Sequence, residues 1–162
     1  MTQLRFTQID LARHAADCVA MRRDSFVISF GDASRFEAES GDEGTGYLHW
    51  LQTHRSRYPQ GLLHAWDGEQ LAGQIEVTRP ESADYLYVNL FYLQPAYRHR
   101  GIGAQLHARV LALLDGDERQ SLRLCAASTN AAALRFYRKH GWQDDGVRAN
   151  APDSRYWRWS AR

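Results

Sequence analysis

The segment best suited to binding an anion spans residues 93–104, where an apolar stretch gives way to the residue spacing of a helix. Backbone N–H groups at a helix start are unpaired, and the helix dipole adds partial positive charge there. Arg98 and Arg100 add two full charges. Gly101 and Gly103 would let phosphate oxygens approach the backbone closely. This spacing predicts a cradle for a pyrophosphate.

The same segment argues against two common nucleotide ligands. It lacks the G-x-x-x-x-G-K-S/T pattern, and Leu106 occupies the third glycine position of the dinucleotide pattern G-x-G-x-x-G. ATP and NAD are therefore poor candidates for the bound anion.

Periodicity and turn signals place the cradle in an α/β fold. Between residues 32 and 46, the polar, glycine-rich run at residues 39–46 predicts a mobile loop. The order β-α-α-β-β-β-α-β-α-β-β calls for a mixed central sheet of about seven strands with helices on both faces. Strands are expected at residues 4–7, 62–66, 71–78, 84–93, 121–127, 142–147 and 155–160, and helices at 10–29, 45–58, 101–114 and 130–140.

Composition fits one domain over residues 1–162. The 162 residues carry a formal charge of +1, so no overall field favours nucleic acid or a lipid surface. Cys18 and Cys125 form no C-x-x-C pair, which favours a reducing, cytoplasmic compartment. We expect no signal peptide or membrane span, and the seven histidines form no H-E-x-x-H pattern, so no metal is expected.

Two segments, correctly ordered, resemble the GCN5-related N-acetyltransferase (GNAT) family. Arg98-x-x-Gly101-x-Gly103 after an apolar strand is similar to the family's acetyl-CoA pyrophosphate loop. Residues 130–142 are similar to its N-x-x-A-x-x-x-Y-x-x-x-G-F/W signature, with Asn130 at the start. The resemblance covers about residues 85–142, whereas residues 1–60 carry no signature of the family.

The resemblance implies that acetyl-CoA lies in a V-shaped gap between the fourth and fifth strands. Its pantetheine arm would pair with the fourth strand, as an added strand would. A backbone N–H near residues 91–93 could polarise the thioester carbonyl. Asn130 would help to orient the cofactor, and its simpler reading as a helix N-cap is compatible with that role. The implied cofactor contacts are Leu93, Arg98, His99, Arg100, Gly101, Ile102, Gly103, Ala104 and Asn130.

Tyr137 matches the tyrosine that lies beside the CoA sulfur in relatives, where it acts as general acid. Attack on a thioester expels a thiolate whose conjugate acid has a pKa near ~8.5, and a phenol with a pKa near ~10 can protonate or stabilise it. The alternative is that Tyr137 only packs under the sheet with Phe136.

The base is harder to assign, because an alkyl ammonium with a pKa near ~10.4 must lose a proton before it attacks. Several relatives place a glutamate on the fourth strand, where this chain has Asn89, which cannot act as a base. Glu76 on the third strand could serve directly or through water, and its alternative is a solvated strand residue.

The resemblance implies that the first two helices and the loop joining the sixth and seventh strands wall the acceptor side. The aromatic residues expected to line it are Phe26, Phe30, Tyr47, Trp50, Tyr85 and Tyr87. Phe30, Trp50 and Asn89 are the candidate substrate contacts, although the aromatic ones are equally good core residues. Acidic residues of the predicted loop could draw in a cationic amine, or could simply be solvated; they are Glu37, Glu39, Asp42 and Glu43.

The sequence therefore predicts an N-acetyltransferase that moves an acetyl group from acetyl-CoA to a primary amine of a small molecule or peptide, by direct transfer in a ternary complex. Transfer of another acyl group, or a non-catalytic CoA-binding module, are the alternatives. The expected partners include no nucleic acid and no membrane, and a homodimer is among them.

Overall fold

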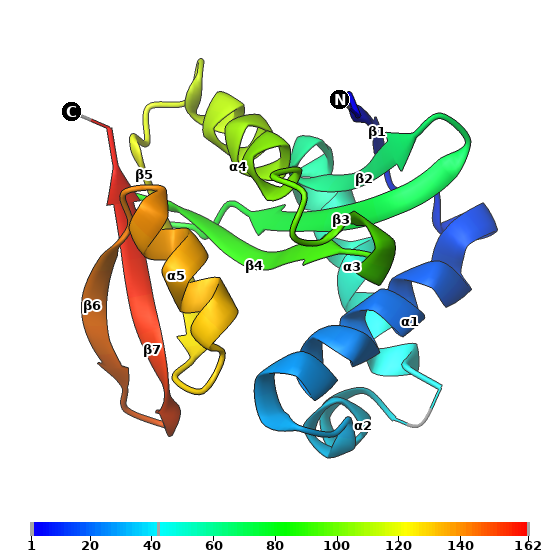
Figure 1. Cartoon of the computed structure of the whole chain (residues 1–162), viewed down its shortest axis with the longest axis horizontal. Coiled ribbons are helices and arrows are strands. Elements are labelled where there is room, and N and C mark those ends of the chain that lie inside the picture. The colour runs from blue at the N-terminus through cyan, green and yellow to red at the C-terminus, as the bar shows by residue number, and fades with distance from the viewer. Residues whose placement is uncertain (1, 42, 162) are drawn as a thin grey trace.

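The computed structural model describes residues 2–41 and 43–161. Its centre is a seven-stranded sheet of order β1-β2-β3-β4-β5-β7-β6, in which β4 and β5 are parallel and every other pair is antiparallel (Figure 1). The strands are β1 (Arg5–Gln8), β2 (Leu62–Asp67), β3 (Gln70–Thr78), β4 (Leu86–Leu93), β5 (Ser121–Ala127), β6 (Gln143–Arg148) and β7 (Ala151–Ser160). The helices are α1 (Leu11–Phe30), α2 (Ser34–Ser40), α3 (Thr45–Arg57), α4 (Gly103–Leu111) and α5 (Ala131–Lys139).

The helices cover both faces of the sheet. On one face, Leu106 and Val110 of α4 and Leu134 of α5 pack with sheet residues such as Val88 and Leu124. On the other face, buried residues of α1, α2 and α3 form a separate cluster around Cys18, Phe36, Tyr47 and Leu51. The mixed α/β fold class expected from the sequence is confirmed.

One expectation about the fold is wrong: residues 34–40 form the helix α2 within the stretch that the sequence analysis assigns to a loop. The reason is tertiary, because Phe36 is buried and its ring lies 5.7 Å from that of Phe26 and 6.0 Å from that of Tyr47. Asp32 supports the helix start by accepting hydrogen bonds from the backbone N–H and the hydroxyl of Ser34. In the described residues, three α-helices, not two, therefore separate β1 from β2.

Strands β4 and β5 diverge soon after they meet. Their pairing runs only from Leu86–Leu122 to Val88–Leu124, although β4 continues to Leu93 and β5 to Ala127. Asn89 lies at the point of divergence. It is also skipped in the register with β3, where Glu76 pairs with Leu90 and Val77 with Val88.

The skipped residue makes Asn89 a β-bulge, which shifts the alternation of β4 by one position. Before the bulge, Val88 packs in the cluster that contains α4. Beyond it, Phe91 faces that same cluster, whereas Leu90 and Tyr92 face Met21 of α1. The divergence and the bulge together open the sheet at its centre.

Candidate functional site

A cavity of about 610 Å³ lies where β4 and β5 diverge. Its walls come from the C-terminal half of α1, from α2, from β4 and β5 around the divergence, from the start of α5 and from the β6–β7 turn. Thr129 and Ser29 join two of these walls, because the threonine hydroxyl donates to the serine carbonyl oxygen at 3.1 Å. Arg35 and Asp153 join two others through an ion pair between α2 and β7. The cavity is thus framed by contacts between segments far apart in sequence.

The edge of β4 that faces the gap offers backbone groups. The N–H of Gln94 donates to the carbonyl oxygen of Ala72 on the far side, at 2.8 Å. Because successive amides of a strand point to opposite sides, the N–H groups of Phe91 and Leu93 point toward the gap. An extended ligand with amide groups could therefore pair with this edge as an added strand would.

Tyr137 of α5 lines the same cavity. Its ring lies 6.4 Å from the ring of Phe91 and 5.7 Å from that of Trp142. Burial raises the pKa of the Tyr137 hydroxyl well above its ordinary value. No hydrogen-bond partner of that hydroxyl lies among the described residues, so the cavity contains a neutral phenol that is free to donate.

The turn from β4 into α4 has the free amides that the cradle requires. The N–H of Arg98 donates to the carbonyl oxygen of Pro95 at 3.2 Å. Within residues 2–41 and 43–161, the N–H groups of residues 99–104 make no hydrogen bond of ordinary geometry. His99 and Gly101 take positive φ values of 59° and 74°, which bend the chain before the helix begins. This turn can bind an anion through its backbone.

Glycine is required at the two glycine positions of the cradle for different structural reasons. Gly101 needs its left-handed φ, and open space surrounds the position where a Cβ would lie. Gly103 instead avoids a steric contact, because its Cβ would lie 3.0 Å from Cε2 of Phe136. The next residue, Ala104, is exposed, and Ile102 is buried in the core.

Both arginines of the cradle form hydrogen bonds with other groups of the protein. Arg98 donates from Nε to the carbonyl oxygen of Leu93 at 2.9 Å, and its Nη2 lies 3.0 Å from the carboxylate of Asp24 on α1. Arg100 donates to the carbonyl oxygen of Ala96 at 3.1 Å and remains exposed. Arg98 therefore ties the end of β4 to α1, and the backbone offers more to an anion than this guanidinium does.

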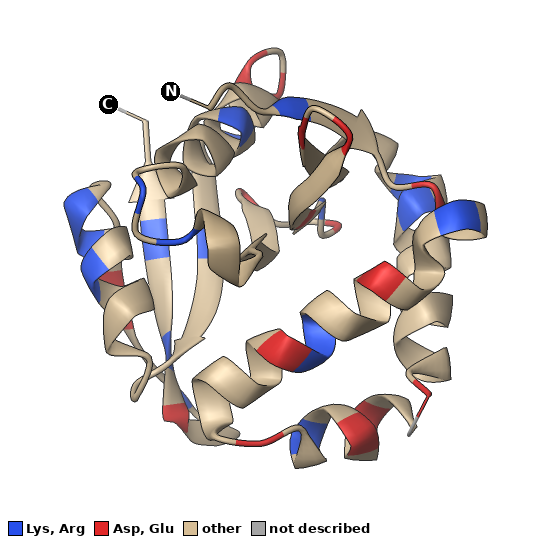
Figure 2. Ribbon diagram, turned by 45° about the vertical axis from the view of Figure 1, so that its right-hand side comes forward, with Lys and Arg blue, Asp and Glu red and all other residues tan. Residues whose placement is uncertain are grey.

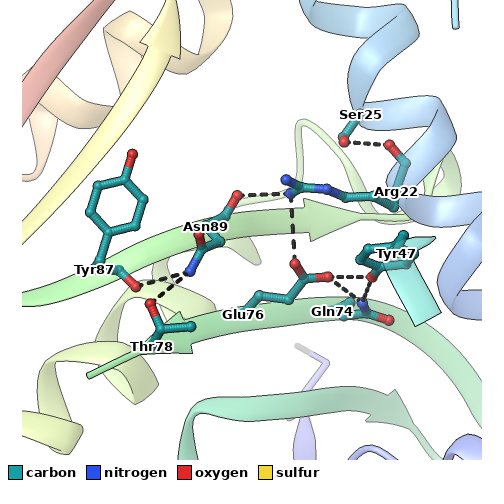
Figure 3. Close-up of polar contacts among 8 residues, drawn as sticks. All are labelled: Arg22, Ser25, Tyr47, Gln74, Glu76, Thr78, Tyr87 and Asn89. Carbon is teal, nitrogen blue, oxygen red and sulfur yellow. Dashed lines mark hydrogen bonds and ion pairs between the residues drawn. The ribbon is translucent and has the colours of Figure 1, made fainter. Parts of the chain in front are cut away.

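A buried polar network underlies the cavity on its α1 side (Figure 3). The carboxylate of Glu76 accepts from the hydroxyl of Tyr47 and from the amide of Gln74, the latter at 2.7 Å. Its other oxygen, Oε1, lies 3.7 Å from Nη1 of Arg22 and has no hydrogen-bond partner. The same Nη1 of Arg22 donates to the carbonyl oxygen of Asn89 at 2.9 Å.

This placement changes the role that Glu76 can take. Glu76 is fully buried and is not among the residues that line the cavity, whereas Arg22 lines it and pairs with the Glu76 carboxylate. Direct contact between Glu76 and an acceptor amine is therefore not supported. Asn89 does line the cavity, and its side-chain amide donates to the hydroxyl of Thr78 at 3.1 Å.

Of the other residues expected to contact the acceptor or the cofactor, two line the cavity and one does not. Phe30 and Asn130 line the cavity, and Asn130 also accepts from the N–H of Ala133 as the N-cap of α5. Trp50 is not among the lining residues; its ring packs along α3 between the rings of Tyr47 and His54, the latter 4.4 Å away.

Both α1 and α2 carry charges of both signs (Figure 2). Glu39 lines the cavity, whereas Glu37 is paired with Arg23 at 3.2 Å. Asp42 lies outside the described residues. No local sequence pattern marks the three arginines of the described lining, Arg22, Arg35 and Arg148, as site residues.

No helix in the described residues combines the length and the apolarity that a bilayer crossing requires. No group of three or more His, Cys, Asp or Glu side chains in the same residues is placed to hold a metal ion.

The chain belongs to the acetyltransferase (GNAT) family, whose model matches residues 17–142. The family resemblance drawn from the two sequence segments is thereby confirmed. No curated protein matches the chain in sequence.

Solved structures share the fold at low sequence identity. A PaiA N-acetyltransferase from Thermoplasma acidophilum, in complex with coenzyme A, has a TM-score of 0.78 and 16% identity over 98% of this chain and 99% of its own. An acetyltransferase from Thermus thermophilus has a TM-score of 0.68 and 17% identity over 99% of this chain and 100% of its own. A Bacillus anthracis protein assigned as a streptothricin acetyltransferase, in complex with acetyl coenzyme A, has a TM-score of 0.56 and 22% identity over 62% of each chain.

Proposed function

We propose that this protein is an acetyl-CoA-dependent N-acetyltransferase that acts on a primary amine in a ternary complex. The observation that carries the proposal is the divergence of β4 from β5 beyond Val88. Beside the gap lies the hydroxyl of Tyr137, which has no hydrogen-bond partner within the described part of the chain. Family membership supports it, as do the similar structures that contain coenzyme A or acetyl coenzyme A.

The residues present fit this cofactor. The free amides of residues 99–104 would hold the pyrophosphate, and the edge of β4 at Phe91 and Leu93 would pair with the pantetheine arm. Bound acetyl-CoA supplies a thioester whose carbonyl carbon the amine attacks, so that a C–N bond forms and the C–S bond breaks.

Two groups of the chain would assist this exchange. A gap-facing N–H of β4 would stabilise the negative charge that develops on the carbonyl oxygen. The neutral Tyr137 hydroxyl would donate its proton to the departing sulfur. The acceptor ammonium loses two protons on its way to the amide. We assign the first, lost before attack, to water of the cavity, since Glu76 is buried behind Arg22, and the second, lost after the C–N bond forms, restores the Tyr137 hydroxyl. Glu76 would then act by holding Arg22 against β4.

The test is the release of free thiol during incubation with acetyl-CoA and a panel of amino acids, polyamines, aminoglycosides and short peptides. We expect at least one amine to raise thiol release well above the rate without amine, with the acetylated amine detected by mass spectrometry. Calorimetric binding of acetyl-CoA without turnover on any amine would instead favour the non-catalytic binding module. Faster turnover with propionyl-CoA or succinyl-CoA would favour another acyl group.

A further inference from the structure

The cavity contains an arginine whose charge is not balanced by a carboxylate. Arg148, the last residue of β6, lines the cavity and donates from Nε to the side-chain oxygen of Asn150 at 2.9 Å. No Asp or Glu within the described residues forms an ion pair with Arg148. By contrast, the lining residues Arg22 and Arg35 have acidic partners, in Glu76 and Asp153.

The acidic residues closest to Arg148 in sequence cannot supply the missing charge, since each is engaged with another arginine. These pairs are Asp144 with Arg155 at 2.7 Å, Asp145 with Arg123 at 3.9 Å, and Asp153 with Arg35. The positive charge of Arg148 is therefore available to a molecule in the cavity.

Tyr87 adds a second hydrogen-bond donor on this side of the sheet. It lies on β4 and lines the cavity, and its ring points away from the Thr78–Asn89 contacts (Figure 3). Its hydroxyl has no partner among the residues that the structure describes. Burial raises the pKa of Tyr87 to about 12, and the nearby charge of Arg148 opposes that rise, so the hydroxyl stays protonated at neutral pH.

A planar guanidinium binds a carboxylate through two parallel N–H···O hydrogen bonds, and a neutral phenol can donate a third. A polyamine would gain much less here, because Glu39, which is exposed, is the single carboxylate among the described lining residues. We propose that the acceptor is an amine that also carries a carboxylate, which Arg148 binds with help from Tyr87. This inference rests on the proposed function and names the substrate class of the same cavity.

The experiment compares amino acids with their decarboxylated counterparts, so that each pair differs by one carboxylate. Tryptophan and tryptamine, phenylalanine and phenethylamine, histidine and histamine, and lysine and cadaverine are assayed with acetyl-CoA by thiol release. For at least one pair we expect kcat/KM to be about tenfold or more higher for the acid. The variants Arg148→Gln and Tyr87→Phe should lower kcat/KM for that acid and leave the decarboxylated amine unchanged.

Two controls separate this effect from a general loss of charge or fold. Arg155→Gln removes an arginine of the same hairpin that is paired outside the cavity lining, and it should keep the preference for the acid. Compared with Arg148→Gln, the variant Arg148→Lys should restore part of the preference for the acid. Lysine keeps the positive charge but lacks the planar guanidinium that forms two parallel hydrogen bonds with a carboxylate.

Other results would overturn the inference that Arg148 binds a carboxylate of the acceptor, while the proposed N-acetyltransferase function would still stand. Equal or better turnover of the decarboxylated amines would do so, as would a preference for acids that survives in Arg148→Gln. If no amine is acetylated, the proposed function fails, and the inference is then judged by calorimetry with tryptophan and phenylalanine. Binding that Arg148→Gln abolishes would still support it, and no binding would contradict it.

Discussion

Arg22 donates from Nη1 to the backbone carbonyl oxygen of Asn89 at 2.9 Å, so a helix side chain holds the bulge at which β4 leaves β5. The same Nη1 lies 3.7 Å from the fully buried carboxylate of Glu76. A buried carboxylate on β3 is thereby linked to the strand edge that faces the gap. This link explains how Glu76 can matter for the reaction without contact with substrate.

The first prediction concerns this link. Glu76→Gln and Arg22→Gln should each destabilise the protein, and a double-mutant cycle of chemical denaturation should give a coupling of about 1 kcal/mol. The exposed pair Arg79 and Glu118, whose closest atoms lie 3.8 Å apart, is the control and should show no measurable coupling. Additive effects in the Glu76–Arg22 cycle would mean that the two residues act separately.

The link should also affect catalysis. If Glu76 positions the β4 edge through Arg22, Glu76→Gln should lower kcat while the KM for the amine changes little, because the amine does not touch Glu76. A purely structural role would change the fraction of folded protein and leave kcat per folded molecule unchanged. Active-site titration of the folded fraction distinguishes these outcomes.

The second prediction concerns Tyr137. Tyr137→Phe removes only the hydroxyl, so kcat should fall by about a hundredfold while the calorimetric Kd for acetyl-CoA stays the same. Tyr85→Phe is the matched control, because Tyr85 is not among the cavity-lining residues and lies near Arg123. An unchanged kcat in Tyr137→Phe would remove the hydroxyl from the chemistry.

The pH profile gives an independent check on the same residue. Because burial raises the pKa of Tyr137, the general acid should remain protonated through the alkaline range in which a free phenol ionises. The rate should therefore show no decline from this group below about pH 10. An alkaline decline at about pH 8.5 that disappears in Tyr137→Phe would contradict the raised pKa, although it would still mark the hydroxyl as the acid.

The third prediction separates the two glycines of the cradle. Gly101→Ala should destabilise the protein by about 1 kcal/mol through its positive φ, and Gly101→Asn should cost less because Asn tolerates that region. Gly103→Ala should disturb Phe136 instead, and Phe136→Leu should relieve that effect by making room. Thermal denaturation of the single and double variants measures both effects. Equal rescue of the two glycine variants by Phe136→Leu would show that this distinction is wrong.

The fourth prediction concerns stability at low pH. Trp142 donates from Nε1 to Nε2 of the buried His107 at 2.9 Å, which requires an unprotonated Nε2. Burial, and then the neighbouring His140, lower the pKa of His107 from 6.5 to about 4. The unfolded chain therefore binds a proton at a higher pH than the folded protein does.

The stabilisation is complete above the unfolded pKa and is lost as the pH falls from about 6.5 to about 4. Denaturation at about pH 7 and about pH 4.5 should show a smaller acid loss in His107→Gln than in the parent protein. His49→Gln, at an exposed site on α3, should behave like the parent. Equal acid losses in all three proteins would exclude His107 as the cause.

Much of the fold was predictable because its signals are local. The Asp67-Gly68 turn between β2 and β3, the N-cap at Asn130 and the strand at residues 121–127 all depend on neighbouring residues, and the structure has them as expected. The helix α2 was missed because its composition is polar and only the burial of Phe36 reveals it.

The site was predictable to a smaller extent. The free amides of residues 99–104 follow from a helix start, which a sequence can signal. The burial of Glu76, the internal contacts of Arg98 and the unpaired charge of Arg148 arise from segments far apart in the chain. No spacing within one segment records such contacts, so they required the structure.

The most direct test of the central claim is a crystal structure of the protein with a non-hydrolysable acetyl-CoA analogue. The pyrophosphate should accept hydrogen bonds from N–H groups of residues 99–104, the pantetheine arm should pair with β4 near Phe91 and Leu93, and the sulfur should lie within reach of the Tyr137 hydroxyl. An analogue bound elsewhere, with the gap between β4 and β5 filled by the protein's own side chains, would contradict the account.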